Sequence, residues 1–91
     1  MGLKALLTVD LENGVTNNQR ERFNNKLNDL MWNKLENFTT AWISSFKDNV
    51  TVPTAFAQVK KDVKAAADEG GIKTFHGAVQ FCEDEPHLFK S

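Results

Sequence analysis

The chain begins with a segment, residues 3–11, in which apolar and mixed positions alternate. One side of this segment carries only apolar residues, namely Leu3, Ala5, Leu7, Val9 and Leu11. The other side carries Lys4, Leu6, Thr8 and Asp10. A period of two predicts a β-strand. One apolar face and one mixed face are typical of a sheet that is covered on one side only.

A helix is predicted after the turn signal at residues 12–14. Thr16 and Gln19 have the spacing of a capping box, in which each side chain bonds to the backbone N–H of the other residue. Apolar residues then recur at helical spacing, at Phe23, Leu27, Leu30 and Met31. This single stripe predicts an amphipathic helix that packs on the sheet.

The middle of the chain is predicted to be extended. Residues 32–35 form either a short strand or the end of the helix, and residues 36–37 fit a tight turn. Residues 38–46 are rich in β-branched and aromatic side chains, which predicts a strand. Its alternation leaves open whether the face with Trp42 or the face with Ile43 contacts the core.

A second helix is predicted to start near Pro53, since proline is well tolerated in a first helical turn. Gly70 and Gly71 predict its end, because glycine readily adopts the left-handed conformation that stops a helix. The expected buried stripe is Phe56, Val59, Val63, Ala66 and Ala67. The expected polar side is Gln58, Lys60, Lys61, Asp62 and Lys64.

The last predicted strand covers residues 72–82. Its core side would carry Phe75, Gly77, Val79 and Phe81. Its outer side would carry Thr74, His76, Ala78, Gln80 and Cys82. Residues 83–91 would form a tail that is either flexible or in contact with a partner.

The predicted order is therefore β-α-β-β-α-β, which is the ferredoxin-like arrangement. We expect an α+β two-layer sandwich: an antiparallel sheet with both helices on one face, formed as a single domain by residues 1–91. An alternative order, β-α-β-α-β, merges the two middle strands and gives a similar sandwich.

Composition fits a globular domain, with 41% apolar and 25% charged residues. The net charge of −1 does not favour a domain-wide attraction to nucleic acid or to anionic lipid. No apolar run is long enough to span a membrane, and residues 1–10 lack the pattern of a signal peptide. Cys82 is the only cysteine, so an internal disulfide is excluded and a cytoplasmic location is expected.

Candidate functional residues lie on the uncovered face of the predicted sheet. Asp10 and His76 would either hold a divalent metal or act as acid and base, or they are simply solvated. The topology does not require them to be close, since the first and last strands belong to different halves of the fold. The expected binding surface is Thr8, Trp42, His76 and Gln80.

Two other features have weaker functional readings. Lys60, Lys61, Lys64 and Lys73 form either a strip that contacts phosphate or an ordinary solvated helix face. Cys82 has no nearby cysteine or evident base, so we expect a buried or edge thiol without a catalytic role.

The first strand and helix carry a further pattern. Residues 6–10 (Leu-Leu-Thr-Val-Asp) end in Asp10, and the helix that follows the polar turn carries Arg20 and Arg22, in the order Asp…Arg-x-Arg…Leu. In a β-α-β-β-α-β chain of this length, the pattern resembles the small CRISPR-associated adaptation nucleases (the second core Cas protein). It is also similar to the GhoS-like relatives of that family among toxin–antitoxin endoribonucleases.

The resemblance implies a ferredoxin-like homodimer in which Asp10 is the ligand of a divalent metal, Mg or Mn, at the dimer interface. The implied substrate is RNA or double-stranded DNA. The residues themselves show no complete catalytic constellation. The prediction is therefore a homodimeric, non-enzymatic regulatory or interaction module that uses its open sheet face and could bind a protein partner. The alternative is a metal-dependent endonuclease that uses Asp10, so whether the chain is an enzyme stays open.

Overall fold

The predicted order of strands and helices is confirmed in the structure, a computed structural model that describes residues 2–35 and 40–84. The elements are β1 (Lys4–Leu11), α1 (Asn17–Asp29), β2 (Asn33–Lys34), β3 (Ala41–Ser45), α2 (Val52–Gly70) and β4 (Phe75–Cys82). This is a ferredoxin-like α+β arrangement. The alternative with merged middle strands is wrong, because β2 and β3 are separate strands that pair with each other.

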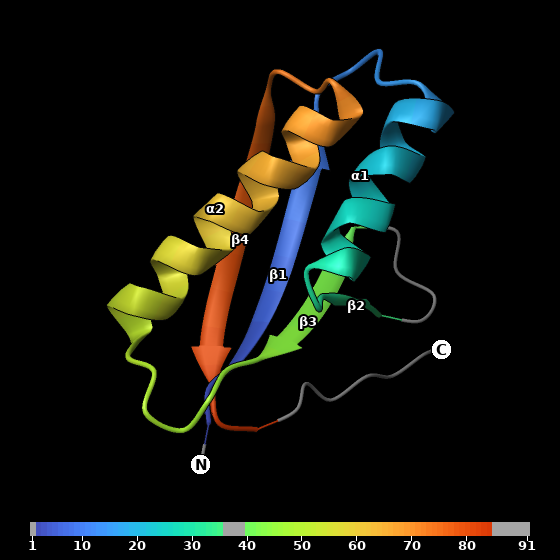
Figure 1. Cartoon of the computed structure of the whole chain (residues 1–91). Coiled ribbons are helices and arrows are strands. Elements are labelled where there is room, and N and C mark those ends of the chain that lie inside the picture. The colour runs from blue at the N-terminus through green and yellow to red at the C-terminus, as the bar shows by residue number, and fades with distance from the viewer. Residues whose placement is uncertain (1, 36–39, 85–91) are drawn as a thin grey trace, which may run out of the picture.

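The strands form one antiparallel sheet in the order β2-β3-β1-β4. Both helices lie on the same side of this sheet, side by side (Figure 1). The other side, which we call the open face, is covered by neither helix (Figure 1). The expectation that both helices pack on one face of the sheet is thus confirmed.

The core lies between the helices and the sheet. Ala5, Leu7 and Val9 of β1 are buried there, as their alternation predicts. Leu7 lies directly opposite Trp42 on β3 and Val79 on β4. Because opposed residues in an antiparallel pair share a face, Trp42 belongs to the helix side, and its side chain is only 2% exposed.

Helix α1 begins with the predicted capping box. The N–H of Gln19 donates to Thr16 Oγ1 at 3.2 Å, and the N–H of Thr16 donates to Gln19 Oε1 at 2.9 Å. Phe23 and Leu27 are buried as expected. The prediction for Met31 is wrong, since this side chain is 77% exposed. The helix ends at Asp29, and the positive φ of 73° at Met31 turns the chain away from helical geometry.

Helix α2 has the predicted ends. Thr51 is its N-cap, Pro53 lies in its first turn, and Gly71 ends it with a left-handed φ of 68°. The prediction that Phe56 belongs to the buried stripe is wrong, because its side chain is 43% exposed. The buried stripe starts instead from Ala55, one residue earlier, and this places Phe56 on the flank of the helix.

The prediction that Asp62 faces solvent is also wrong. Its side chain is 7% exposed and accepts hydrogen bonds from Trp32 Nε1 at 3.0 Å and Gln58 Nε2 at 2.7 Å. A buried carboxylate needs such partners, since an unpaired one would be costly to desolvate. Asp62 therefore ties α2 to the buried indole that follows α1.

The last strand starts later than predicted, at Phe75. Residues 72–74 form a connection in which the backbone N–H groups of Lys73 and Thr74 donate to Glu12 Oε1. The predicted turn at 36–37, the start of the predicted strand 38–46 and residues 85–91 of the predicted tail lie outside the described residues. None of the helices in the described ranges has the length and apolar character that crossing a membrane requires.

Candidate functional site

The open face is built from regular rows of opposed residues on β4, β1 and β3. The first row is Cys82, Lys4 and Ser45; the second is Gln80, Leu6 and Ile43; the third is Ala78, Thr8 and Ala41. A fourth row pairs His76 with Asp10. The middle rows are therefore apolar or neutral, while the charges of Lys4 and Asp10 lie at opposite ends of β1.

Asp10 and His76 are brought together by the fold. They are directly opposed in the β1–β4 register, and both side chains are exposed. This proximity was not predicted from the sequence, because β1 and β4 are neighbours in the sheet although they are distant along the chain. Together the two residues offer a carboxylate oxygen and an imidazole nitrogen on one exposed patch.

These two donors bear on the expected metal. Mg²⁺ commonly uses one or two carboxylates together with water and substrate oxygens, so Asp10 would suit it as a single protein ligand, with His76 beside it. Within residues 2–35 and 40–84, no group of at least three His, Cys, Asp or Glu side chains comes close enough to hold an ion. Among the described residues, Asp10 and His76 therefore do not form a complete metal site on their own.

The other predicted binding residues divide between the two faces. Thr8 and Gln80 are exposed on the open face as expected. Trp42 is not on that face, because it is buried against the helices, so its predicted role in binding there is wrong. Cys82 is an exposed thiol on the edge strand β4, and its Sγ donates to the backbone oxygen of Asp84 at 3.0 Å.

A second candidate surface is the outer edge of β4. Among the described residues, no strand pairs with that edge. The N–H of Glu12 donates to the carbonyl oxygen of its opposite residue, Thr74, at 3.2 Å. Hydrogen-bonded and non-hydrogen-bonded pairs alternate along an antiparallel ladder, so the backbone N–H and C=O groups of Phe75, Gly77 and Val79 point outward, away from β1.

The hydrogen bonds between β1 and β3 lead to the same conclusion about which backbone groups of β4 point outward. The N–H of Val9 donates to the carbonyl oxygen of Thr40 at 3.1 Å, and therefore points away from β4. Gly77, which lies opposite Val9 on β4, thus makes no ladder bond to β1. The residues with outward backbone groups are also the ones whose side chains lie on the helix side of the sheet.

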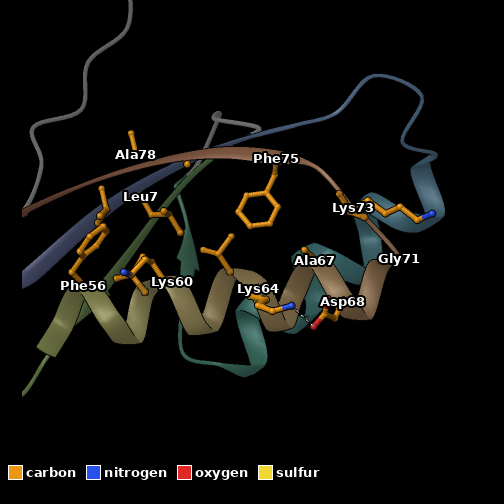
Figure 2. Close-up of a pocket in the computed structure, with 15 residues that line it drawn as sticks. Leu7, Phe56, Lys60, Lys64, Ala67, Asp68, Gly71, Lys73, Phe75 and Ala78 are labelled. Atoms are coloured by element: carbon orange, nitrogen blue, oxygen red, sulfur yellow. Dashed lines mark hydrogen bonds and ion pairs between the residues drawn. The ribbon is translucent and has the colours of Figure 1, made fainter. Parts of the chain in front are cut away.

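A groove of about 970 Å³ runs between α2 and β4, directly beside this free edge (Figure 2). We call it the α2–β4 groove. Its apolar surface comes mainly from Val59 and Val63 on α2, from Ile72 in the connection that follows α2, and from Leu7, Phe75 and Val79 on the sheet. Gly77 also lines it, and a Cβ atom at that position would meet only Thr8 O, at 3.7 Å. The space above Gly77 is therefore unfilled.

Charge at the mouth of the groove is mainly positive. Lys60, Lys64 and Lys73 line it together with a single acid, Asp68 (Figure 2). Lys64 Nζ lies 3.4 Å from Asp68 Oδ2. Lys60 Nζ lies 4.6 Å from the centre of the exposed Phe56 ring. Lys61, the other lysine of the predicted strip, is exposed but does not line the groove.

The groove was not predicted from the sequence, although two signals point toward it. A glycine inside a strand pattern often marks a place where another group approaches the backbone closely, and Gly77 is such a residue. The lysine strip was noted, but its relation to β4 depends on how α2 lies across the sheet. Phe56 was assigned to the core, so its exposed place beside Lys60 was missed.

Comparisons with protein-family models, with curated proteins and with solved structures gave no match to this chain.

Proposed function

We propose that this chain is a non-enzymatic regulatory or interaction module that works as a homodimer joined through its open face. The observation that carries the proposal is the set of middle rows on that face. Leu6 and Ile43 lie side by side there, flanked by Ala78 and Thr8, with no helix of the described residues above them. An apolar centre with a polar surround is the usual composition of a protein–protein interface.

The arrangement of charge favours a second copy as the occupant of this face. In a face-to-face pair with a two-fold axis across the middle of β1, Lys4 of one copy lies over Asp10 of the other. The same rotation brings the Leu6 row of one copy onto the Thr8 row of the other. A two-fold interface is self-complementary in this way, since each contact occurs twice.

The oligomeric state in solution tests the proposal. We expect a dimer by sedimentation equilibrium, and we expect Leu6→Glu to give a folded monomer because it places two buried charges at the interface. Val52→Glu is the matched control, since Val52 is a 47% exposed residue on α2 and not on the open face. A wild-type chain that stays monomeric at high concentration contradicts the proposal.

A charge exchange tests the register. Lys4→Asp alone and Asp10→Lys alone each place like charges opposite one another, so both should weaken the dimer. The double variant Lys4→Asp/Asp10→Lys restores the opposite charges and should recover dimerisation. If both single variants dimerise as tightly as the wild type, this register is wrong.

The pairing of Asp10 with His76 supports a second candidate function, a metal-dependent endonuclease acting on RNA or double-stranded DNA. A carboxylate could bind Mg²⁺ or Mn²⁺ and position a water, and a neighbouring imidazole could accept or donate a proton. The test is incubation of the protein with both nucleic acids and either metal. Cleavage that is unchanged in Asp10→Ala contradicts this function.

The two candidates also differ in the dimer they require. A metal shared at the dimer interface brings the two Asp10 residues together, whereas the charge register keeps them at opposite ends. In a Cys82→Ser background, Asp10→Cys should form an intersubunit disulfide under mild oxidation only if the two positions meet. Crosslinking would favour the shared metal, and no crosslinking in a confirmed dimer would favour the charge register.

A further inference from the structure

The α2–β4 groove lies on the helix side of the sheet and not on the open face, and it combines two features. One is a row of backbone N–H and C=O groups of β4, at Phe75, Gly77 and Val79, which point outward from its free edge. The other is an apolar hollow beside the same residues, on the helix side. An incoming strand can use both at once, with its backbone bonding to the edge and alternate side chains entering the hollow.

The dimensions of the groove suit an extended segment. The α2 residues that line it run from Phe56 to Asp68, a length of about 18 Å at 1.5 Å per residue. An extended chain rises about 3.4 Å per residue, so about five or six residues of a strand would span the groove. The unfilled space above Gly77 would receive one of its apolar side chains.

The charges at the groove mouth define the chemistry of the segment. Three lysines and one aspartate line the groove, and Lys64 already lies beside that aspartate. Lys73 lies near the start of β4 and Lys60 toward the other end of the groove (Figure 2). Acidic residues at the two ends of the segment would meet these lysines.

We propose that the α2–β4 groove binds an extended segment of another protein, which adds antiparallel to β4 as a fifth strand. Its groove-facing positions are apolar in the centre and acidic at the ends. A second copy of the chain is a poorer occupant, because edge-to-edge pairing of two β4 strands would bring the Lys60 and Lys64 side chains of both copies toward one seam. A fatty acid would fill the apolar hollow but would leave the edge N–H and C=O groups without partners.

A synthetic nonapeptide, Thr-Glu-Thr-Val-Thr-Val-Thr-Glu-Thr with blocked ends and a fluorescent label, is a suitable probe. Its Glu and Val side chains share one face of a strand, and the Thr side chains share the other. We expect saturable binding to the full chain, measured by fluorescence anisotropy. A peptide with Lys in place of both Glu residues should bind at least about tenfold more weakly, because its charges face Lys60 and Lys73.

Backbone methylation separates strand addition from other kinds of binding. In antiparallel addition the groove-facing residues also direct their N–H groups at β4. N-methylation of the two Val residues should therefore abolish binding, whereas N-methylation of the two Thr residues on either side of the Val-Thr-Val centre should leave it within about twofold. Equal effects of the two modifications, or the reverse order, would overturn antiparallel strand addition.

Variants of the protein locate the site. Lys60→Glu should weaken peptide binding by at least about tenfold. Lys61→Glu makes the same charge change at the next residue, outside the groove, and should have an effect of less than about threefold, because salt screens distant charges. Gly77→Leu should also weaken binding by filling the hollow, with folding checked by circular dichroism. Equal losses in Lys60→Glu and Lys61→Glu would overturn the groove as the site.

Two further measurements complete the test. Leu6→Glu, which disrupts the proposed dimer, should still bind the nonapeptide, so failure of the open-face proposal and failure of the groove proposal are separable. Dodecanoate is the competing probe for an amphipathic anion. The strand proposal is overturned if the nonapeptide does not bind at all, whereas dodecanoate binds and Lys60→Glu weakens the binding of dodecanoate.

Discussion

The two edges of the sheet are built in opposite ways. At one edge, β2 has only two residues, Asn33 and Lys34, and the neighbouring strand buries Trp42. Ser44 Oγ also donates to the carbonyl oxygen of Met31 there, at 3.0 Å. At the other edge, β4 has eight residues without a proline, and its core-side residues are either partly buried (Phe75, Val79 and Phe81) or exposed (Gly77).

This difference shows which edge the fold protects. Short edge strands and lysine side chains are common ways to prevent an edge from pairing with another chain, and β2 has both features. The edge at β4 is long, has outward backbone groups and lies beside an apolar groove. We therefore regard the β2 edge as the closed side of the molecule and the β4 edge as the side at which the proposed partner strand would bind.

The largest expected effect on stability comes from removing the buried side chain of Trp42 near the closed edge. Trp42→Ala should lower the free energy of unfolding by about 3–5 kcal/mol, because it removes a buried indole and leaves a cavity. The measurement is urea denaturation followed by circular dichroism.

Phe75→Ala is the matched change at the β4 edge, where the side chain is only partly buried. Phe75→Ala should lower the free energy of unfolding by less than half as much as Trp42→Ala, since the stabilisation scales with the apolar area removed from water. Equal losses would mean that the two edges are packed alike.

The buried polar contact near the closed edge should have the next largest effect. Asp62→Ala removes the acceptor of the Trp32 indole N–H and should lower the free energy of unfolding by about 1–3 kcal/mol, because a buried donor is left unpaired. Asp68→Ala is the control on the same helix. Its side chain is 67% exposed, so its change should stay within about 0.5 kcal/mol. Similar effects of the two variants would contradict a structural role for Asp62.

The smallest effect is expected at Gly77, on the open edge. Gly77→Ala should raise the free energy of unfolding by about 0.5–1 kcal/mol, because alanine restricts the unfolded chain and its Cβ has space in the groove. Gly70→Ala is the contrasting change, since a Cβ there would lie 2.7 Å from Gln19 O. It should destabilise the protein. Thermal denaturation of the two variants checks the opposite signs, and a loss of stability in Gly77→Ala would mean that the space above Gly77 is filled.

Much of the fold could be predicted from the sequence. The buried side of β1, the capping box at Thr16 and the stop at Gly71 are all correct in the structure. Errors occurred at Met31, Phe56 and Asp62, which lie at a helix end or on the flank of a stripe. Their burial depends on where the neighbouring element begins, and local periodicity carries no information on that.

The candidate site could be predicted only in part. Thr8, Asp10, His76 and Gln80 were assigned to the open face, and they lie there. Trp42 was placed on it incorrectly, because the strand alternates between two faces that are both rich in β-branched, aromatic or small residues. The meeting of Asp10 with His76 was missed because these residues are more than fifty positions apart in the chain. The α2–β4 groove was missed because it depends on how α2 lies beside β4 and β1.

The sequence by itself thus determined the features that depend on residues within a few positions of each other: which side of β1 is apolar, where the helices begin and where α2 ends. Alternation, caps and glycine conformation act over such short distances. Only the tertiary structure decided which face buries Trp42, which partner satisfies Asp62, which residue lies opposite Asp10 and which edge of the sheet stays open. These outcomes depend on the order of the strands and on how α2 lies across them, and both are set by the packing of the whole chain.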